Sequence, residues 1–373
     1  MIRLAQPAID EADIAAVAAV LRSGWLVQGA EVRAFEAEIA RIAGTPHAVA
    51  VNSGTAALHL ALLAMGVGPG DEVAVAAFSW PATANAVVLC GARPVFVDIE
   101  PRTAGMDPAR LQARLAASGK FRAVLPVHAF GGLADIAGIC GVAEAHGVPV
   151  LEDAACALGA RAEERPAGSW GAAACFSFHP RKVVTTGEGG AVTSHDPELA
   201  DRVRALRNHG LDPRNADPDF RSVGMNCRMT EFQGALGRVQ LGKLPDLIAA
   251  HRRVADWYAE LLAALPVERP HSAGPDAHIY QAYVVLLPPG LAAQRPELLS
   301  RLRRAGVEAT IGTHHIPLTG YYRREGGYRP GDFPVTDDIA ARAVALPMHH
   351  ALRREDAEQV AEQLGGALRE LSG

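Results

Sequence analysis

The sequence is poor in lysine over most of its length: between residues 31 and 240 the only lysines are Lys120 and Lys182. The chain of 373 residues carries 36 basic and 41 acidic side chains, a net charge of −5. This balance gives no basic face for nucleic acid and no acidic tail. No run approaches the roughly 20 apolar residues of a membrane-spanning helix. We therefore expect neither nucleic acid nor membrane as a partner.

Paired cysteines and metal-binding motifs are also missing. The five cysteines are scattered and never spaced CxxC, which excludes a disulfide framework and predicts reduced thiols. The pairs His314-His315 and His349-His350 are adjacent in sequence. Neighbouring side chains of a strand or helix face different ways, so we expect no metal site. The N-terminal MIRLAQPAIDEAD lacks the apolar stretch of a signal peptide, and we expect a cytoplasmic protein.

Short apolar runs alternate with helical patterns in the first part of the chain. Strands are predicted at 48–52, 73–77, 94–98, 123–127, 148–152, 172–178 and 190–194. Helices are predicted at 55–65, 81–90, 108–116, 133–146 and 197–208. Runs such as AVLPV and VPVLE are continuously apolar, which is typical of parallel strands buried on both faces. The alternation predicts an α/β fold with a mostly parallel sheet.

The pattern changes after about residue 246. Long amphipathic helices are predicted at 247–264, 296–305 and 354–371, with a strand at 280–286. We predict a large domain with an N-terminal arm over 1–245, and a smaller α+β domain over 246–373.

Lys182 lies in FSFHPRKVVTTGEGG, between the end of a predicted strand and a glycine-rich turn. A lysine amine in such a partly desolvated position can attack an aldehyde. The alternative is an ordinary surface lysine on a loop.

Asp153 directly follows a predicted strand in VPVLEDAACALGA. Ligands of open α/β sheets bind at the carboxyl ends of strands. A carboxylate there can keep a pyridine nitrogen protonated. The alternative is a helix N-cap. Glu152 is expected to point to the opposite side.

Two further strand ends carry candidate ligands. Ser53-Gly54-Thr55 joins a strand to a helix; Gly54 allows close approach, and free N–H groups favour a phosphate. The alternative is simply a capped helix. Trp80 follows another strand and could stack on a flat ring, or be a core tryptophan. Because the ends of parallel strands converge on one crevice, the four features together match the needs of pyridoxal phosphate.

Several segments resemble the DegT/DnrJ/EryC1/StrS aminotransferases: SGTAALHLAL, EDAACALGA, FSFHPRKVVTTGEGG and GMNCRMTEFQGALGRVQL. LRSGWLVQG and LPMHHALRREDAEQV extend the resemblance over nearly the whole chain. It implies a pyridoxal-phosphate (PLP) enzyme of fold type I, with a seven-stranded, mostly parallel sheet. It also implies a homodimer whose active sites lie at the interface.

The resemblance assigns roles to individual residues. Lys182 would hold the cofactor as a Schiff base and move protons, Asp153 would bond the pyridine nitrogen, and Trp80 would stack on the ring. The remaining cofactor contacts would come from Gly54, Thr55, Ala56, Ala155, Cys156 and Ser177, and from Asn226 of the partner subunit. Relatives often have Gln or His where this chain has Cys156, so the contact to the cofactor's ring hydroxyl is in doubt. Arg228 would help to shape the dimer interface and could also bind the donor's carboxylate. Residues that could line the substrate pocket are Trp25, Gln28, Arg228, His314 and His315.

The predicted activity is amino transfer from glutamate or glutamine to a keto sugar, usually nucleotide-linked, while the cofactor alternates between pyridoxal and pyridoxamine phosphate. A cyclitol (inosose) aminotransferase is an alternative, because the acceptor pocket is not legible in the sequence. A non-catalytic cofactor-binding sensor is another. A related branch that removes a sugar hydroxyl has histidine in place of the lysine, so Lys182 argues against it.

Overall fold

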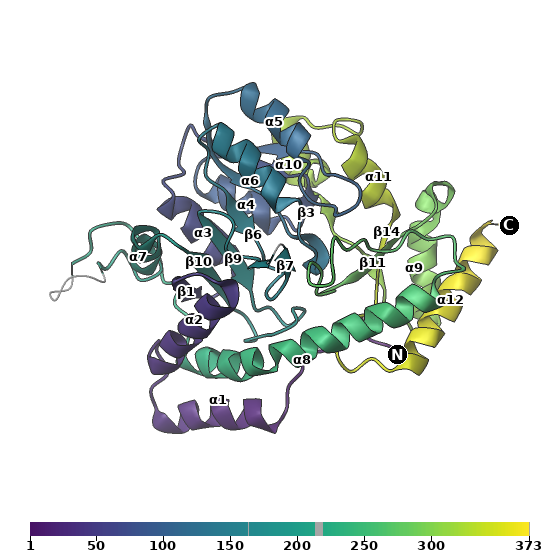
Figure 1. Ribbon diagram of the computed structural model, residues 1–373, viewed down its shortest axis with the longest axis horizontal. Coiled ribbons are helices and arrows are strands. Elements are labelled where there is room, and N and C mark those ends of the chain that lie inside the picture. Colours follow the sequence, from purple (N-terminus) through teal and green to yellow (C-terminus); the bar gives the residue numbers. More distant parts are fainter. Residues whose placement is uncertain (163, 213–218, 373) are drawn as a thin grey trace.

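A central sheet organises the protein in a computed structural model that describes residues 1–162, 164–212 and 219–372 (Figure 1). Its described strands form two ladders, in the orders β1-β10-β9-β6 and β4-β2-β5. Parallel bridges from Val124 to Val150 and from Val127 to Asp153 join the ladders. The strands are β1 (His47–Val51), β2 (Glu72–Ala76), β4 (Arg93–Val97), β5 (Phe121–Leu125), β6 (Leu151–Asp153), β9 (Ala173–Ser177) and β10 (Gly190–Ser194).

The direction of the strands sets where side chains meet. β10 runs antiparallel to both of its neighbours, whereas the pairings among β9, β6, β5, β2 and β4 are parallel. All seven predicted strands form, and the predicted α/β fold is confirmed. The register aligns Val51 with Gly190 and Gly190 with Ser177. The carboxyl ends of β1, β6 and β9 therefore lie at one edge of the sheet.

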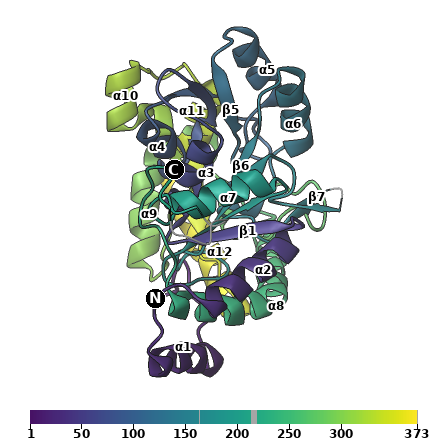
Figure 2. The same cartoon turned by 90° about the vertical axis from the view of Figure 1, so that its left-hand side faces the viewer.

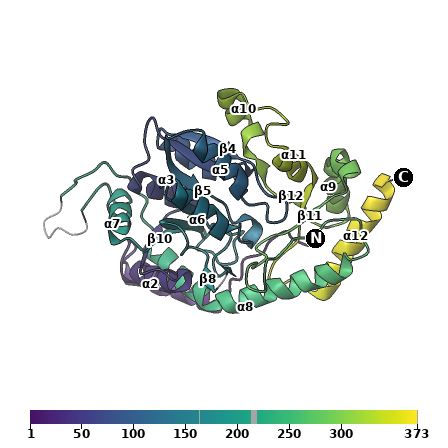
Figure 3. The ribbon, with the colours of Figure 1, turned by 45° about the horizontal axis from the view of Figure 1, so that its top comes forward.

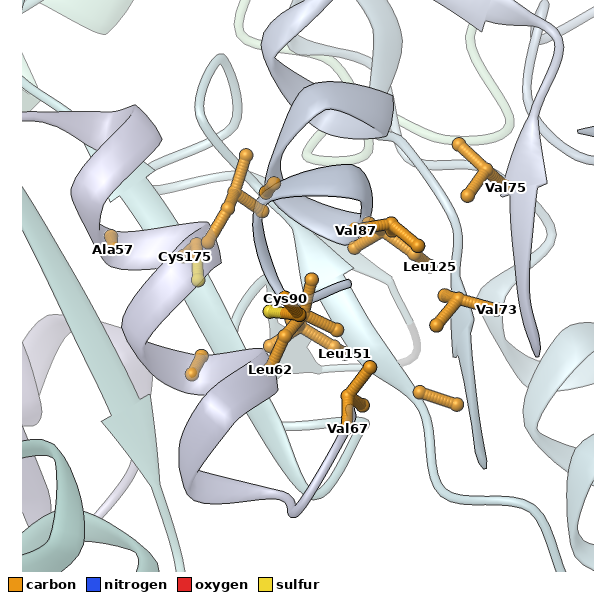
Figure 4. Close-up of a cluster of buried hydrophobic side chains, with 14 of the residues drawn as sticks. Ala57, Leu62, Val67, Val73, Val75, Val87, Cys90, Leu125, Leu151 and Cys175 are labelled. Atoms are coloured by element: carbon orange, nitrogen blue, oxygen red, sulfur yellow. The ribbon is translucent and has the colours of Figure 1, made fainter. Parts of the chain in front are cut away.

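Helices cover both faces of the sheet, because successive strand side chains point to opposite sides. On β2, Val73 and Val75 join a core with α3 and α4, shown in Figure 4, whereas Ala74 and Ala76 pack with α5 and α6. Figure 2 shows α5 and α6 on the side of the sheet away from α3 and α4. The bounds are α3 (Gly54–Ala64), α4 (Ala82–Leu89), α5 (Pro108–Ala116), α6 (Ile136–Ala145) and α7 (Pro197–Leu206).

Helix α8 (Glu231–Leu261) links the sheet to the C-terminal part of the chain (Figure 3). Its first half packs with α2 (Ala30–Ala43) on the sheet, and its second half joins the C-terminal core. The helix predicted at 247–264 corresponds to the second half of α8. Pro245 lies inside the helix without ending it, so the predicted division at 245/246 falls within one helix and stays a prediction.

The C-terminal part has its own three-stranded sheet, in the order β11-β14-β12, with α9, α12 and the end of α8 packed on it. A short strand of the C-terminal part, β13, pairs antiparallel with β3, which follows β2 in the chain. No helix in the described part of the chain is long and apolar enough to cross a bilayer. The remaining elements are α1 (Glu11–Ser23), β3 (Phe78–Ser79), η1 (Ala129–Gly131), β7 (Arg161–Ala162), β8 (Arg165–Pro166), β11 (Tyr283–Leu286), η2 (Pro289–Gln294), α9 (Arg295–Arg304), β12 (Thr310–Ile311), β13 (His314–His315), η3 (Ile316–Leu318), α10 (Gly320–Gly326), α11 (Pro334–Arg342), β14 (Ala343–Leu346) and α12 (Arg354–Ser372).

A distant carboxylate caps helix α2. The first N–H groups of a helix lack partners within it, and Gly29 at the N-cap has no side chain to supply one. The buried carboxylate of Glu231 accepts hydrogen bonds from the N–H of Gly29 at 2.6 Å, Glu31 at 2.7 Å and Val32 at 3.2 Å. Its negative charge also suits the positive end of the helix dipole.

We expect Glu231→Ala to lower the free energy of unfolding by about 2–3 kcal/mol, because three buried donors lose their acceptor. Urea unfolding followed by circular dichroism measures this. Glu231→Gln keeps one acceptor oxygen and should cost less, and Glu362→Ala on the exposed face of α12 should cost almost nothing. Equal stability of the alanine variant and the unchanged protein would rule out this capping role.

Candidate active site

The turn from β1 into α3 forms a narrow cradle. The Ser53 hydroxyl caps α3 by accepting from the N–H of Ala56 at 3.1 Å. The turn is therefore a capped helix start, and this role does not occupy the N–H groups of Gly54 and Thr55. The N–H groups of Gly54 and Thr55 keep no acceptor within the helix. A Cβ added to Gly54 would lie 2.9 Å from the Cβ of Ser177, and one added to Gly190 would lie 2.4 Å from the carbonyl oxygen of Ser53. Glycine is therefore required where the three strands meet.

Asp153 ends β6 at the same edge and is buried. Its Oδ2 accepts from the Thr83 hydroxyl at 2.8 Å, and its Oδ1 accepts from the N–H of Ala155 at 3.2 Å. Burial raises the pKa of Asp153, while the two hydrogen bonds and the nearby charge of Lys182 offset part of that rise. Turns rather than a helix follow Asp153, so the N-cap alternative is wrong.

Lys182 points at the same region. Its Nζ donates to the Sγ of Cys156 at 3.0 Å, across 26 residues of sequence. The side chain is partly buried, so it is not an ordinary surface lysine. Cys156, whose contact to the cofactor the resemblance left in doubt, contacts the lysine in this structure.

Trp80 is exposed over 62% of its surface, so the alternative of a core tryptophan is wrong. The pairing of β13 with β3 brings His314 against it, with ring centroids 5.2 Å apart. His315 points the other way, toward Phe333, with its Nε2 3.0 Å from an oxygen of Asp337. The structure therefore places only His314 of this pair beside Trp80.

The NCRM segment lies beside the cradle of its own protomer, because the carbonyl of Cys227 accepts from the N–H of Asn52 at 2.9 Å. Asn226 itself is exposed. Arg228 donates to the side-chain oxygen of Asn208 at 2.5 Å. The part played by Asn226 in a partner's site stays a prediction.

Trp25 and Gln28 lie elsewhere in the protomer. They line a cleft together with Val20, Arg33 and Glu231, and the lining includes neither Lys182 nor Asp153. Trp25 is 60% exposed, and the side-chain oxygen of Gln28 is buried without a hydrogen-bond partner. One described protomer does not bring these two residues to the lysine.

Glu152 points to the opposite side from Asp153, as predicted, and anchors a loop. Its carboxylate accepts from the N–H groups of Gly168, Trp170 and Gly171 at 2.8–3.0 Å. The Nδ1 of His128 accepts from the N–H of Ala134, so its Nε2 carries the proton and donates to Glu152 at 3.0 Å. Burial alone would raise the pKa of Glu152, but these hydrogen bonds lower it overall.

We expect Glu152→Gln to lower the free energy of unfolding by about 2–5 kcal/mol at neutral pH, because the new amide group faces N–H donors that then lack an acceptor. Because the pKa of Glu152 is depressed, its stabilisation is present above about 4.5 and is lost as the pH falls through the lower folded value. Denaturant unfolding at several pH values should therefore show the two proteins converging in acid. A difference that is constant with pH would contradict this account, and Glu362→Gln serves as the exposed control.

Thr83 and Ser79 reach the site but were not predicted from the sequence. Both hydroxyls are buried, 2.9 Å apart, and Thr83 contacts Asp153. A threonine in the first turn of a helix, four residues after a strand-end serine, is the local signal that could have found them.

These residues fit pyridoxal phosphate. The cradle at α3 offers N–H groups and the Ser177 and Thr55 side chains to a phosphate. The buried Asp153 carboxylate suits a protonated ring nitrogen, and the Lys182 amine suits an aldehyde. Trp80 leaves an exposed aromatic face beside them.

A family model gives the same assignment. The model for the DegT/DnrJ/EryC1/StrS aminotransferase family matches residues 7–365. This match covers more than nine-tenths of the chain and confirms the resemblance seen in the sequence.

Curated and solved relatives agree over almost their full length. GDP-perosamine synthase of Caulobacter vibrioides is 38% identical over 370 residues, covering 98% of both chains. The UDP-N-acetyl-3-dehydro-alpha-D-glucosamine 3-aminotransferase of Acidithiobacillus ferrooxidans is 36% identical over 344 residues, covering 92% of this chain and 90% of its own. Spr1654 of Streptococcus pneumoniae, solved in a PMP-form and also in a PLP-form, superposes with a TM-score of 0.93 and 27% identity, covering all of both chains in the PMP-form.

Proposed function

Because the chain belongs to the DegT/DnrJ/EryC1/StrS aminotransferase family, we propose that it moves an amino group from glutamate or glutamine to a nucleotide-linked keto sugar, using pyridoxal phosphate. The observation that carries the proposal is the meeting of Lys182, Asp153 and the α3 cradle at one sheet edge. The names of two relatives support the acceptor class, since they specify GDP-linked and UDP-linked sugars.

When bound, pyridoxal phosphate supplies an aldehyde that accepts the amino group and a ring that withdraws electrons. Gly54, Thr55, Ala56 and Ser177 would hold its phosphate. Asp153 would hold a proton on the ring nitrogen, and the exposed face of Trp80 would pack on the ring. Burial strengthens the pairing of Asp153 with a cation, because the surroundings of the carboxylate are poor in water.

Lys182 has two tasks in this proposal. Its amine would hold the cofactor's aldehyde between turnovers, and the free amine would accept and return the proton that amino transfer requires. Cys156 lies 3.0 Å from this amine and gives it a defined position within the site. The same amine would serve as the proton carrier when the amino group passes to the keto sugar.

The protein would work as a homodimer. Several large apolar side chains are exposed in the N-terminal segment, among them Leu21, Trp25 and Val27, and Val223 is 95% exposed near Asn226. We infer that these exposed apolar side chains become covered in the dimer interface. Asn226, Trp25 and Gln28 would then complete the partner's site. All five cysteines are free thiols, as expected in the reducing cytoplasm.

The test is a screen of purified protein, loaded with pyridoxal phosphate, against GDP- and UDP-linked keto sugars and against inososes, following glutamate consumption. We expect amino transfer to at least one nucleotide-linked sugar. Transfer to inososes alone would identify a cyclitol aminotransferase instead, and no transfer by fully loaded dimers to any acceptor would contradict the proposal.

A further inference from the structure

Thr83 connects two distant parts of the chain at the candidate site. It lies in the first turn of α4 and is 1% exposed. Its hydroxyl lies 2.8 Å from Oδ2 of Asp153, which is 70 residues away in sequence. This is the shorter of the two hydrogen bonds to that carboxylate, since the N–H of Ala155 lies 3.2 Å from Oδ1.

The chemistry of the carboxylate decides which groups donate in these hydrogen bonds. An ionised carboxylate only accepts hydrogen bonds, so the Thr83 hydroxyl donates to Asp153. The Ser79 hydroxyl, 2.9 Å away, must then donate to Thr83. Two hydrogen bonds, from Ser79 to Thr83 and from Thr83 to Asp153, thus form a hydroxyl relay that ends on the carboxylate.

The hydroxyl relay begins at Ser79, beside Trp80 and His314. Ser79 belongs to β3 and pairs in register with His314 of β13, and Trp80 follows it directly. The hydroxyl relay therefore joins the turn that carries Trp80 to the carboxylate at the end of β6. A buried aspartate held from one side by a fixed donor has one preferred orientation.

We propose that Thr83 is a positioning residue, which fixes the Asp153 carboxylate in the orientation that faces the cofactor's ring nitrogen. This inference rests on the proposed function, because it assumes that Asp153 faces that nitrogen. Nothing on the Thr83 side chain would touch the reacting atoms, so its effect passes through Asp153.

The electrostatics of the carboxylate agree with this role. Burial raises the pKa of Asp153, and the hydrogen bond from Thr83 is the largest influence that lowers it again. Removing the hydroxyl therefore leaves an aspartate that takes up a proton at higher pH. A protonated Asp153 no longer attracts a cationic ring nitrogen.

The experiment measures the dissociation constant of pyridoxal phosphate as a function of pH for Thr83→Val, Thr83→Ser and the unchanged protein. A hydrogen bond to an ionised group is worth about 10- to 100-fold in an equilibrium constant, so we expect Thr83→Val to weaken binding by that factor. Its affinity should also begin to fall at a higher pH on acidification. Thr83→Ser should restore both properties.

The chain offers a matched control. Thr336 is fully buried and donates to the buried Asp98 at 2.7 Å, the same kind of contact in the first turns of α11. Thr336→Val should leave cofactor affinity and its pH dependence unchanged. In an Asp153→Asn background, Thr83→Val should add little further loss, because the charge on which it acts is gone.

Thr83→Val with unchanged affinity and an unchanged pH dependence would overturn the inference, as would a full additional loss in the Asp153→Asn background. If Thr83→Val does not fold, Thr83→Ala takes its place, and an unchanged affinity with an unchanged pH dependence in that variant would overturn the inference in the same way. Failure of the proposed function looks different, since the unchanged protein would then bind the cofactor but transfer no amino group.

Discussion

Lys182→Ala should abolish steady-state amino transfer. Proton transfer by a positioned side chain contributes about 10²- to 10⁴-fold to a rate, and the variant loses the covalent anchor as well, so we expect a fall of at least that size. The variant should still fold, because the Lys182 side chain is only partly buried and its amine hydrogen-bonds to Cys156 within the described part of the chain. Glutamate consumption with a reactive acceptor measures the rate.

Two lysine controls sharpen this experiment. Lys182→Arg keeps a positive charge near Asp153 but cannot act as the nucleophile, and it should be as inactive as the alanine variant. Lys120→Ala removes an exposed lysine and should leave the rate unchanged. Substantial activity in either Lys182 variant would show that another group performs the proton transfer.

Asp153→Asn should be the second most damaging change. Asparagine keeps the shape of aspartate, but its single acceptor oxygen can serve either Thr83 or Ala155 and not both. It also removes the negative charge that a protonated ring nitrogen needs. Loss of one preorganised electrostatic partner costs about 10²- to 10³-fold in rate, and we expect an effect of that order. Steady-state kinetics should show the lower rate, and a binding measurement should show a weaker affinity for the cofactor.

The buried Asp98 provides the comparison, because it accepts from the N–H of Val335 and from both the N–H and the hydroxyl of Thr336, at the start of α11. Asp98→Asn should lower stability but leave the turnover of the folded, loaded protein close to normal. If Asp98→Asn lowered turnover as much as Asp153→Asn, the effect would reflect general damage to buried carboxylates.

The layered fold could be predicted from the sequence, because the pattern of apolar residues along the chain distinguishes buried strands from amphipathic helices. Continuously apolar runs such as AVLPV became inner strands with both faces covered. Helix α5 begins at Pro108 and ends at Ala116 as predicted, since Asp107 caps it and proline occupies its first turn. Helix α8 begins at Glu231, earlier than the helix predicted at 247–264, and it continues through Pro245 with both of its halves packed on neighbouring elements.

The sequence was sufficient to predict which candidate site residues lie at the ends of strands. Lys182, Asp153 and the Ser53-Gly54-Thr55 turn each follow a strand, and a parallel sheet brings such positions to one edge. Contacts between side chains were not predictable. The Lys182–Cys156 contact spans 26 residues and the Thr83–Asp153 hydrogen bond spans 70, and no local pattern encodes which side chains meet over such separations.

Borohydride reduction of the cofactor-loaded protein, followed by peptide mass analysis, tests the central assignment most directly. The chain has three lysines, Lys120, Lys182 and Lys243, so each possible attachment point lies in a separate peptide. Lys243 is already held by Asp10 and Asp13, and Lys120 is exposed. We predict that the reduced cofactor is found on the Lys182 peptide alone; an unmodified Lys182 peptide from fully loaded protein, or label on Lys120 or Lys243, would contradict the account.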